Sequence, residues 1–169
     1  MRISKFVCGA FLIAAIILGA ISMSAAKPAK SLSDKKFDAL ATQALEAMKQ
    51  KAAELSIQGV AVVSYAVGDD VQGWSSKMAV VGRLTDPKGS ANGNNLLGIA
   101  YAKSAEMART LKDSGTAGGA PMTGEFGWQG GVILKTSSGS VIVAFSGGKS
   151  EVDVQVSKAG LEVMKKGFL

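Results

Sequence analysis

Two pairs of expected strands, each joined by a turn, alternate along this chain with three segments of helical periodicity. The first pair covers residues 60–65 and 74–81 around the turn Gly68-Asp69-Asp70, and the second covers residues 131–135 and 141–145 around residues 136–140. Neighbouring β-branched runs separated by turn residues are typical of β-hairpins, whose two strands are antiparallel. Two hairpins in one short chain therefore predict a mainly antiparallel sheet.

Apolar residues recur every three or four positions before the first hairpin and after the second one. Ser33, followed by Asp34, is the expected N-cap of the first helix, and Ser150 and Asp153 have the spacing of a capping box at the start of the last one. The last helix is expected to reach Lys166. The predicted core positions of the first helix are Phe37, Leu40, Ala41, Ala44, Met48, Ala52 and Leu55, and those of the last are Val152, Val156, Ala159, Leu161 and Val163.

A third helix is predicted between the two hairpins. It begins after Asn94 or Asn95, reaches about Leu111 and has Gly115 as its expected stop. Its expected core stripe is Leu97, Tyr101, Ala105, Ala108 and Leu111, so that Lys103 and Arg109 point elsewhere. The order helix, hairpin, helix, hairpin, helix predicts an α+β fold in which three helices pack on the antiparallel sheet.

The first 26 residues have the layout of a secretory signal peptide. Arg2 and Lys5 precede an apolar run at 6–21, and the small residues Ser24-Ala25-Ala26 follow it. The run of sixteen residues is shorter than the roughly 20 needed to span a membrane, which favours cleavage after Ala26 over a retained anchor. We therefore expect an exported protein, periplasmic or secreted and without a stable membrane span after cleavage, in which a polar lead-in at 27–32 precedes a single domain at 33–169.

The composition excludes several kinds of chemistry. The chain has no histidine, and its one cysteine, Cys8, lies in the predicted signal peptide. A disulfide, a Ser-His-Asp or Cys-His arrangement and an ordinary structural zinc site are therefore not expected in the mature chain. After cleavage 17 basic residues would face 13 acidic ones, spread along the chain without a basic block, so nucleic acid is not an expected partner.

The segment 113–131 combines many glycines with large apolar side chains. Met122, Phe126 and Trp128 stand among seven glycines, namely Gly115, Gly118, Gly119, Gly124, Gly127, Gly130 and Gly131. Glycine lets a backbone approach a ligand or partner closely, and exposed aromatic rings are unfavourable in water unless something covers them. The segment is therefore a binding rim, an oligomer contact, or a loop whose aromatic side chains fold back onto the core.

The last third of the chain resembles a known family. The residues concerned are Gly130-Gly131-Val132-Ile133, Gly139, Phe145-Ser146-Gly147-Gly148, Glu151-Val152-Asp153 and Ala159-Gly160-Leu161. Together they resemble the C-terminal signature of the GlcG/HbpS-type haem-binding family, and the likeness extends over about residues 33–167. The resemblance implies a profilin-like sandwich that is frequently oligomeric and associates with haem or other tetrapyrroles.

Three functions follow as hypotheses from the resemblance and the residue types. In the first, the domain binds haem or a related tetrapyrrole without catalysis: apolar side chains form a slot, two cations meet the propionates, and Tyr101, Met122 or, more weakly, Thr123 contacts the iron. The candidate residues are Tyr101, Lys103, Arg109, Met122, Thr123, Phe126 and Trp128. In the second, Phe126 and Trp128 bury themselves in a homo-oligomer that has no small ligand. The third, enzymatic haem breakdown, lacks an evident catalyst without histidine or cysteine.

Overall fold

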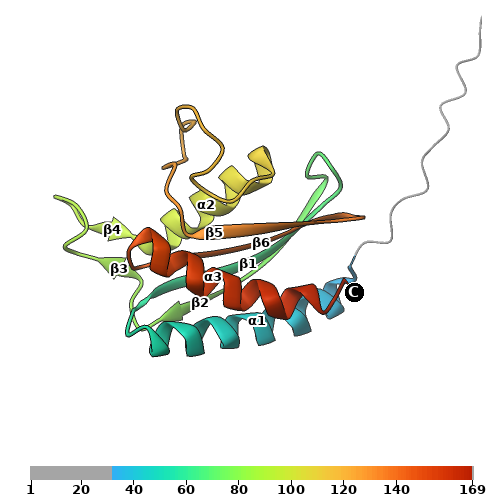
Figure 1. Cartoon of the computed structure of the whole chain (residues 1–169), viewed down its shortest axis with the longest axis horizontal. Coiled ribbons are helices and arrows are strands. Elements are labelled where there is room, and N and C mark those ends of the chain that lie inside the picture. The colour runs from blue at the N-terminus through green and yellow to red at the C-terminus, as the bar shows by residue number, and fades with distance from the viewer. Residues whose placement is uncertain (1–31, 169) are drawn as a thin grey trace, which may run out of the picture.

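The computed structural model describes residues 32–168, so the predicted signal peptide and nearly all of the lead-in lie outside the described residues. Within these residues the chain forms three helices and four long strands, in the alternation expected from the sequence, and Figure 1 shows how they are arranged. In chain order the elements are α1 (Asp34–Glu54), β1 (Gly59–Val67), β2 (Gly73–Val81), β3 (Thr85–Asp86), β4 (Asn94–Asn95), α2 (Leu96–Thr110), β5 (Gly131–Thr136), β6 (Gly139–Ser146) and α3 (Ser150–Lys165).

The four long strands form one antiparallel sheet in the order β2-β1-β6-β5. Each predicted hairpin forms one half of it, and the halves join where β1 pairs with β6, from Val60 opposite Ser146 to Val67 opposite Gly139. The predicted α+β class and the antiparallel sheet are confirmed. The connection between β2 and α2 contains the two-residue strands β3 and β4, which pair with each other.

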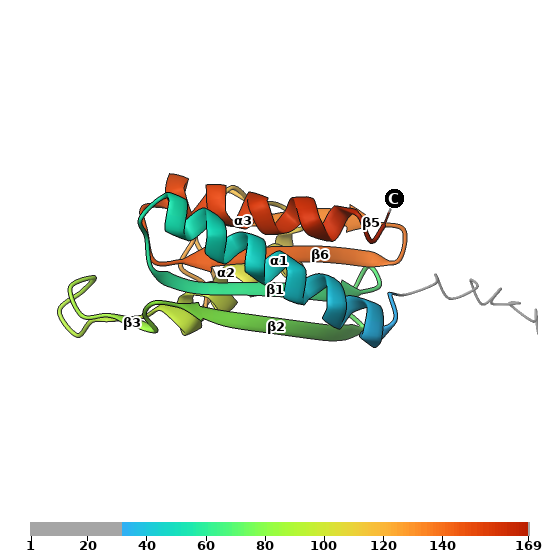
Figure 2. The same cartoon turned by 90° about the horizontal axis from the view of Figure 1, so that it is seen from below.

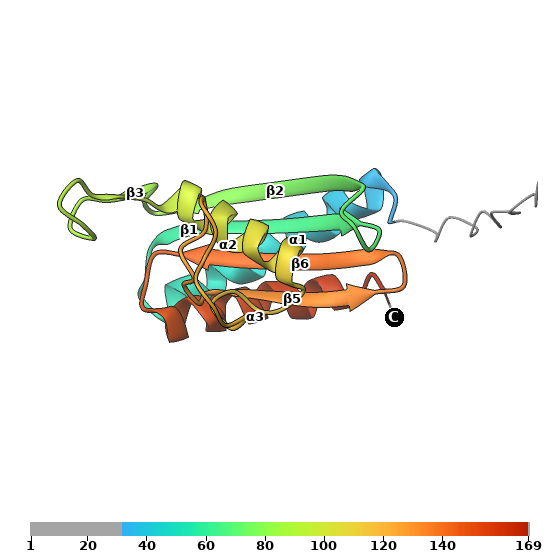
Figure 3. The ribbon, with the colours of Figure 1, turned by 90° about the horizontal axis from the view of Figure 1, so that it is seen from above.

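The helices cover both faces of the sheet. α1 and α3 lie side by side on one face, as Figure 2 shows, and α2 crosses the opposite face in Figure 3. Because side chains alternate along a strand, β1 directs Val63 and Tyr65 toward α1 and α3 and directs Val60 and Val62 toward α2. Two apolar layers therefore stabilise the sheet, one on each face.

Gly160 sets the close packing of α3 against α1. A Cβ atom at this position would lie 2.7 Å from the sulfur of Met48 on α1 and 3.1 Å from a methyl carbon of Val143 on β6. Met48 is fully buried and belongs to the core cluster on this face, as predicted from the α1 stripe. The glycine thus lets two helices and a strand meet at one point of the core.

The predicted core stripe of α2 misses the positions that the helix buries most deeply, although Leu97, Tyr101 and Ala108 do pack against the core clusters on this face. The helix buries Leu96, Ile99, Ala100, Lys103 and Met107, whereas Leu97, Tyr101, Ala108 and Leu111 are only partly buried and Ala105 is exposed. The expectation that Lys103 points away from the core is therefore wrong. Both stripes have helical spacing, and the true one contains a lysine whose partner lies fifty residues further along the chain, which local periodicity cannot reveal.

The helix ends differ in part from the predictions. Asn95 does cap α2, because its side chain accepts a hydrogen bond from the Gly98 N–H at 3.1 Å. The helix ends at Thr110 with Leu111 as its C-cap, so the expected end near Leu111 is confirmed to within one residue. The left-handed φ of 53° at Leu111 ends the helix, before the expected stop at Gly115. Ser33 occupies the N-cap position of α1 without a side-chain cap bond. The capping box expected at the start of α3 is absent. Lys149 is the N-cap there, and Asp153 instead forms bonds outside the helix.

None of the helices within residues 32–168 combines the length and the apolar character needed to span a membrane.

Candidate functional site

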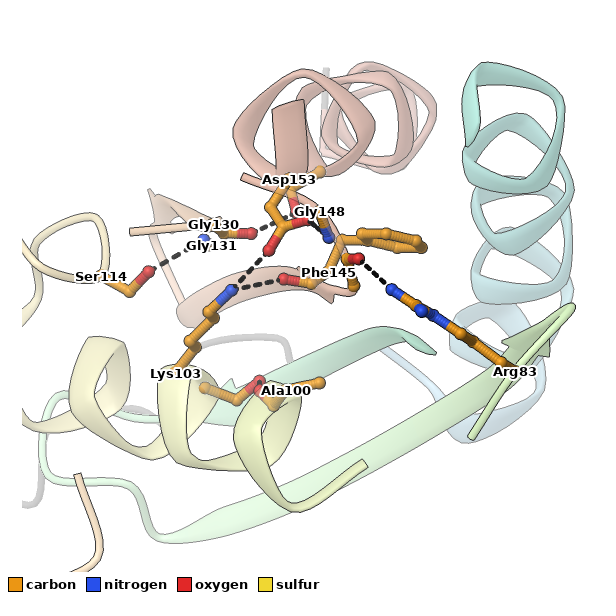
Figure 4. Close-up of polar contacts among 12 residues, drawn as sticks. Arg83, Ala100, Lys103, Ser114, Gly130, Gly131, Phe145, Gly148 and Asp153 are labelled. Carbon is orange, nitrogen blue, oxygen red and sulfur yellow. Dashed lines mark hydrogen bonds and ion pairs between the residues drawn. The ribbon is translucent and has the colours of Figure 1, made fainter. Parts of the chain in front are cut away.

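A buried ion pair connects the two faces of the sheet at the end of β6. The Lys103 Nζ on α2 donates to the Asp153 Oδ2 on α3 at 2.9 Å and to the Phe145 carbonyl at 2.8 Å, and both charged side chains are 3% exposed (Figure 4). Asp153 Oδ1 accepts a further hydrogen bond from the Gly148 N–H at 2.8 Å. These bonds fix the first turn of α3 against α2.

Gly130 makes room for this connection. A Cβ atom there would lie 2.2 Å from the Lys103 Nζ, so the lysine passes over a stretch of backbone that has no side chain. The Gly130 carbonyl accepts from the buried Ser157 hydroxyl at 2.6 Å and from the Phe145 N–H at 3.0 Å. The positive φ of 134° at Gly130 also favours glycine. The chain entering β5 is therefore held between α2, β6 and α3.

Burial dominates the electrostatics of this ion pair. It lowers the pKa of Lys103 and raises the pKa of Asp153, because desolvation disfavours both charged forms, while the attraction between the two groups opposes each shift. A lysine with a lowered pKa can act in catalysis. Here, however, two hydrogen bonds occupy its Nζ, and only a cavity of about 90 Å³ adjoins it. The geometry is that of a structural connection.

The second feature is an exposed apolar surface on the loop between α2 and β5, which we call the aromatic rim and define as Met122, Phe126 and Trp128. The Phe126 and Trp128 rings are 4.9 Å apart between centroids and 46% exposed each, and Met122 is 57% exposed. The alternative in which these side chains fold back onto the core is therefore wrong. Trp128 also borders the small cavity beside Lys103, so the rim lies next to the ion pair.

Five hydrogen bonds hold the loop that carries the aromatic rim. Arg109 on α2 donates to both carboxylate oxygens of Glu125, at 2.7 and 2.8 Å, and Glu125 also accepts from the Met122 N–H at 3.0 Å. At the ends of the loop, the Gly131 N–H donates to the buried Ser114 hydroxyl, and the Gly115 N–H donates to Glu106. The rim is thus fixed to α2 although it consists of irregular backbone.

Hydrogen bonds from Arg109 and Met122 lower the pKa of Glu125 to about 2, from an ordinary value of 4.5. A lowered pKa in the folded state means that the ionised carboxylate stabilises the fold above pH 4.5 and that this contribution is lost as the pH falls toward 2. We expect the Glu125 carboxyl carbon to titrate by NMR near pH 2 and to titrate at higher pH in Arg109→Gln. Lys112→Gln is the matched control, since it removes a neighbouring exposed cation; an equal upward shift there would contradict the specific role of Arg109.

The structure brings only some of the predicted site residues together. The Phe126 and Trp128 rings lie side by side, Met122 and Thr123 are exposed on the same loop, and Arg109 supports that loop through Glu125. Tyr101 is separate from them, because its hydroxyl lies 3.1 Å from the Ser76 hydroxyl on β2. Lys103 is buried in its ion pair. The two cations predicted for propionates therefore both have carboxylate partners.

Several residues of interest were not predicted from the sequence. Asp153, Glu106 and Glu125 are the partners that order α2 and its loop, and the only local signal for them is a charged residue, Lys103, on the helix face that continues Leu96, Ile99 and Met107. Arg83 lines a separate hollow of about 570 Å³ between the end of α1 and β2, where it donates to the Gly147 carbonyl at 2.8 Å.

Comparison with known proteins gives no relative from which a role could be transferred. No family model matches the chain, and no curated protein is significantly similar to it. Within the part of the chain that the structure describes, no cluster of three or more acidic, histidine or cysteine side chains could hold a metal ion.

Proposed function

We propose that this protein is a non-catalytic binding module for haem or a related tetrapyrrole, that it acts outside the cytoplasm, and that the macrocycle docks on the aromatic rim. The GlcG/HbpS resemblance and export after Ala26 remain hypotheses within this proposal. The observation that carries it is the pair of neighbouring, half-exposed rings at Phe126 and Trp128.

The shape and support of the rim suit a flat apolar ligand. Aromatic rings attract other π-systems by offset stacking, and covering half-exposed rings removes apolar surface from water. The loop is fixed by Arg109, Glu125 and Ser114, so the rings are already ordered before a ligand arrives. Binding surfaces are commonly formed by loops that expose large apolar side chains and whose backbone is held in place by hydrogen bonds.

Of the residues considered for contact with iron, Met122 is the best placed. Its side chain belongs to the rim and is exposed, whereas the Tyr101 hydroxyl faces Ser76 on β2. The Met122 thioether would therefore be the side chain that contacts the iron, and Tyr101 would have no role in binding. Arg109 contributes by holding the loop through Glu125, and Lys103 by joining α2 to α3. Neither is assigned to the propionates, because both already have carboxylate partners.

An absorbance titration of the purified protein with haemin tests this function. We expect a saturable one-to-one Soret shift, and about tenfold weaker binding in Phe126→Ala and in Trp128→Ala, because each ring would contribute roughly 1–1.5 kcal/mol by covering its exposed half. Trp74→Ala is the matched control, since Trp74 is also about half-exposed but lies on β2. Met122→Ala should alter the spectrum of the complex, and Tyr101→Phe should leave it unchanged.

Two results would refute the proposed function. One is the absence of a saturable shift at micromolar haemin in the unsubstituted protein. The other is equal weakening by Trp74→Ala and Trp128→Ala, which would indicate nonspecific adsorption of haemin to exposed tryptophan.

Self-association is the second candidate function, and the open edge of the sheet favours it. β2 is one of the two outer strands of the sheet and exposes Trp74 and Val80, and an exposed apolar edge strand is usually covered or paired. In this alternative the aromatic rim or the β2 edge packs against a second copy. Light scattering separates the two functions: loss of an oligomer in Trp128→Ala, together with no haemin shift in the unsubstituted protein, would favour the scaffold.

A further inference from the structure

A second small cavity lies between α2 and the glycine-rich loop. It measures about 90 Å³, and its charged lining consists of Glu106 and Arg109 from α2 and Glu125 from the loop. The rest of its wall is formed by small residues of the loop, among them Ala117 and Pro121. Roughly three water molecules occupy this volume in the liquid, so the cavity can hold the end of a small polar group but not a macrocycle.

Glu106 brings an unpartnered oxygen to this cavity. The residue is only 4% exposed, and its Oε1 accepts a hydrogen bond from the Gly115 N–H at 2.8 Å. Its Oε2 is buried and has no hydrogen-bond partner among residues 32–168. A buried carboxylate oxygen without a donor is strongly unfavourable, so an occupant that donates a hydrogen bond would stabilise the fold.

The neighbouring charged groups do not supply the hydrogen-bond donor that Glu106 Oε2 lacks. The carboxylate of Glu125 is occupied by Arg109 and by the Met122 N–H. The hydrogen bond to Glu125 is the main cause that raises the pKa of Arg109, and the charge of Glu106 adds a smaller contribution. Arg109 and Glu125 therefore neutralise each other, and Glu106 leaves the cavity with one net negative charge. A cation is the complementary occupant.

The number of free oxygens indicates which kind of cation fits. Calcium and magnesium ions need about six oxygen ligands, whereas Glu106 Oε2 is the one carboxylate oxygen of this cavity without a donor. An ammonium group needs only acceptors for its N–H bonds and can share them with backbone carbonyls and water. We propose that this cavity binds the primary ammonium group of an amine, with Glu106 as its carboxylate partner.

Thermal unfolding of the purified protein with methylammonium chloride tests this site. We expect a saturable rise of roughly 3–5 °C in the unfolding midpoint at ten times the dissociation constant. Tetramethylammonium at the same ionic strength has no N–H donor and should give no rise. Glu106→Gln should abolish the response, whereas Glu151→Gln, which removes an exposed charge on α3, should retain it.

Ala117→Leu is a second variant that leaves the carboxylate in place and fills the cavity. It tests whether the cavity binds methylammonium if Glu106→Gln does not fold. It too should abolish the response to methylammonium. The proposal is overturned if the unsubstituted protein does not respond, if tetramethylammonium is equally effective, or if the folded variants respond normally. A blocked lysine, Nα-acetyl-lysine methylamide, distinguishes the source of the amine: tighter binding than methylammonium assigns the site to a lysine side chain, and weaker binding assigns it to a small free amine.

Discussion

Asp153→Ala is expected to lower the free energy of unfolding by about 3–5 kcal/mol, because it leaves the Lys103 ammonium buried without its counter-charge. Such a loss is a large fraction of the stability of an ordinary domain. Urea denaturation at neutral pH measures it directly. The double variant Lys103→Met, Asp153→Leu should recover most of the loss, because it replaces both charges by apolar groups of similar size.

The pH dependence of the two single variants distinguishes a charge effect from lost packing. In Asp153→Ala, the pKa of Lys103 in the folded state falls further below 10.5, so the unfolded state binds more protons and stability rises as the pH is raised. In Lys103→Met, the pKa of Asp153 rises further above 3.8, so the folded state binds more protons and stability rises as the pH is lowered. If the loss in the free energy of unfolding does not change with pH in either variant, the result would contradict a charged pair.

Gly130→Ala should destabilise the domain by about 3 kcal/mol. The new methyl group would lie 2.2 Å from the Lys103 Nζ, 2.9 Å from the Asp153 Cβ and 3.0 Å from the Phe145 carbonyl oxygen, so either the ion pair or the backbone must move. Overpacking of a close contact and an unfavourable positive φ both contribute. The midpoint of urea denaturation is again the measurement.

Gly124→Ala is the matched control for Gly130→Ala. Gly124 also has a positive φ, of 92°, but an added Cβ would meet nothing within 4 Å. Gly124→Ala should therefore lower the free energy of unfolding by only about 1 kcal/mol, the cost of a positive φ at a residue with a Cβ atom. Equal losses in the two variants would mean that the close approach of Lys103 does not limit residue 130.

The fold could be predicted from the sequence because its signals are local. The hairpin from β5 to β6 is recognisable from two β-branched runs around a short turn, and α1 from an apolar stripe of which Phe37 and Met48 are buried as expected. Period-two and period-3.6 patterns reflect which side chains face the core, so they survive in the sequence of an element that packs on one side.

The candidate site could be predicted only in part. The aromatic rim followed from the unusual composition of residues 113–131, but the ion pair and the loop anchors did not. Lys103 is fifty residues from Asp153, and Arg109 is sixteen residues from Glu125, so neither pairing leaves a local pattern. A buried lysine cannot be told from an exposed one when only apolar positions are counted. The predicted stripe of α2 therefore missed the face of the helix that contains Lys103.

The anchoring of the rim loop has a kinetic consequence. Because Arg109, Ser114 and Glu106 already hold its backbone, docking a ligand on the rings requires little ordering of the chain. Encounter with a ligand then needs no prior rearrangement, and closely related ligands should associate at similar rates. Selectivity among them would therefore reside in how long each complex lasts.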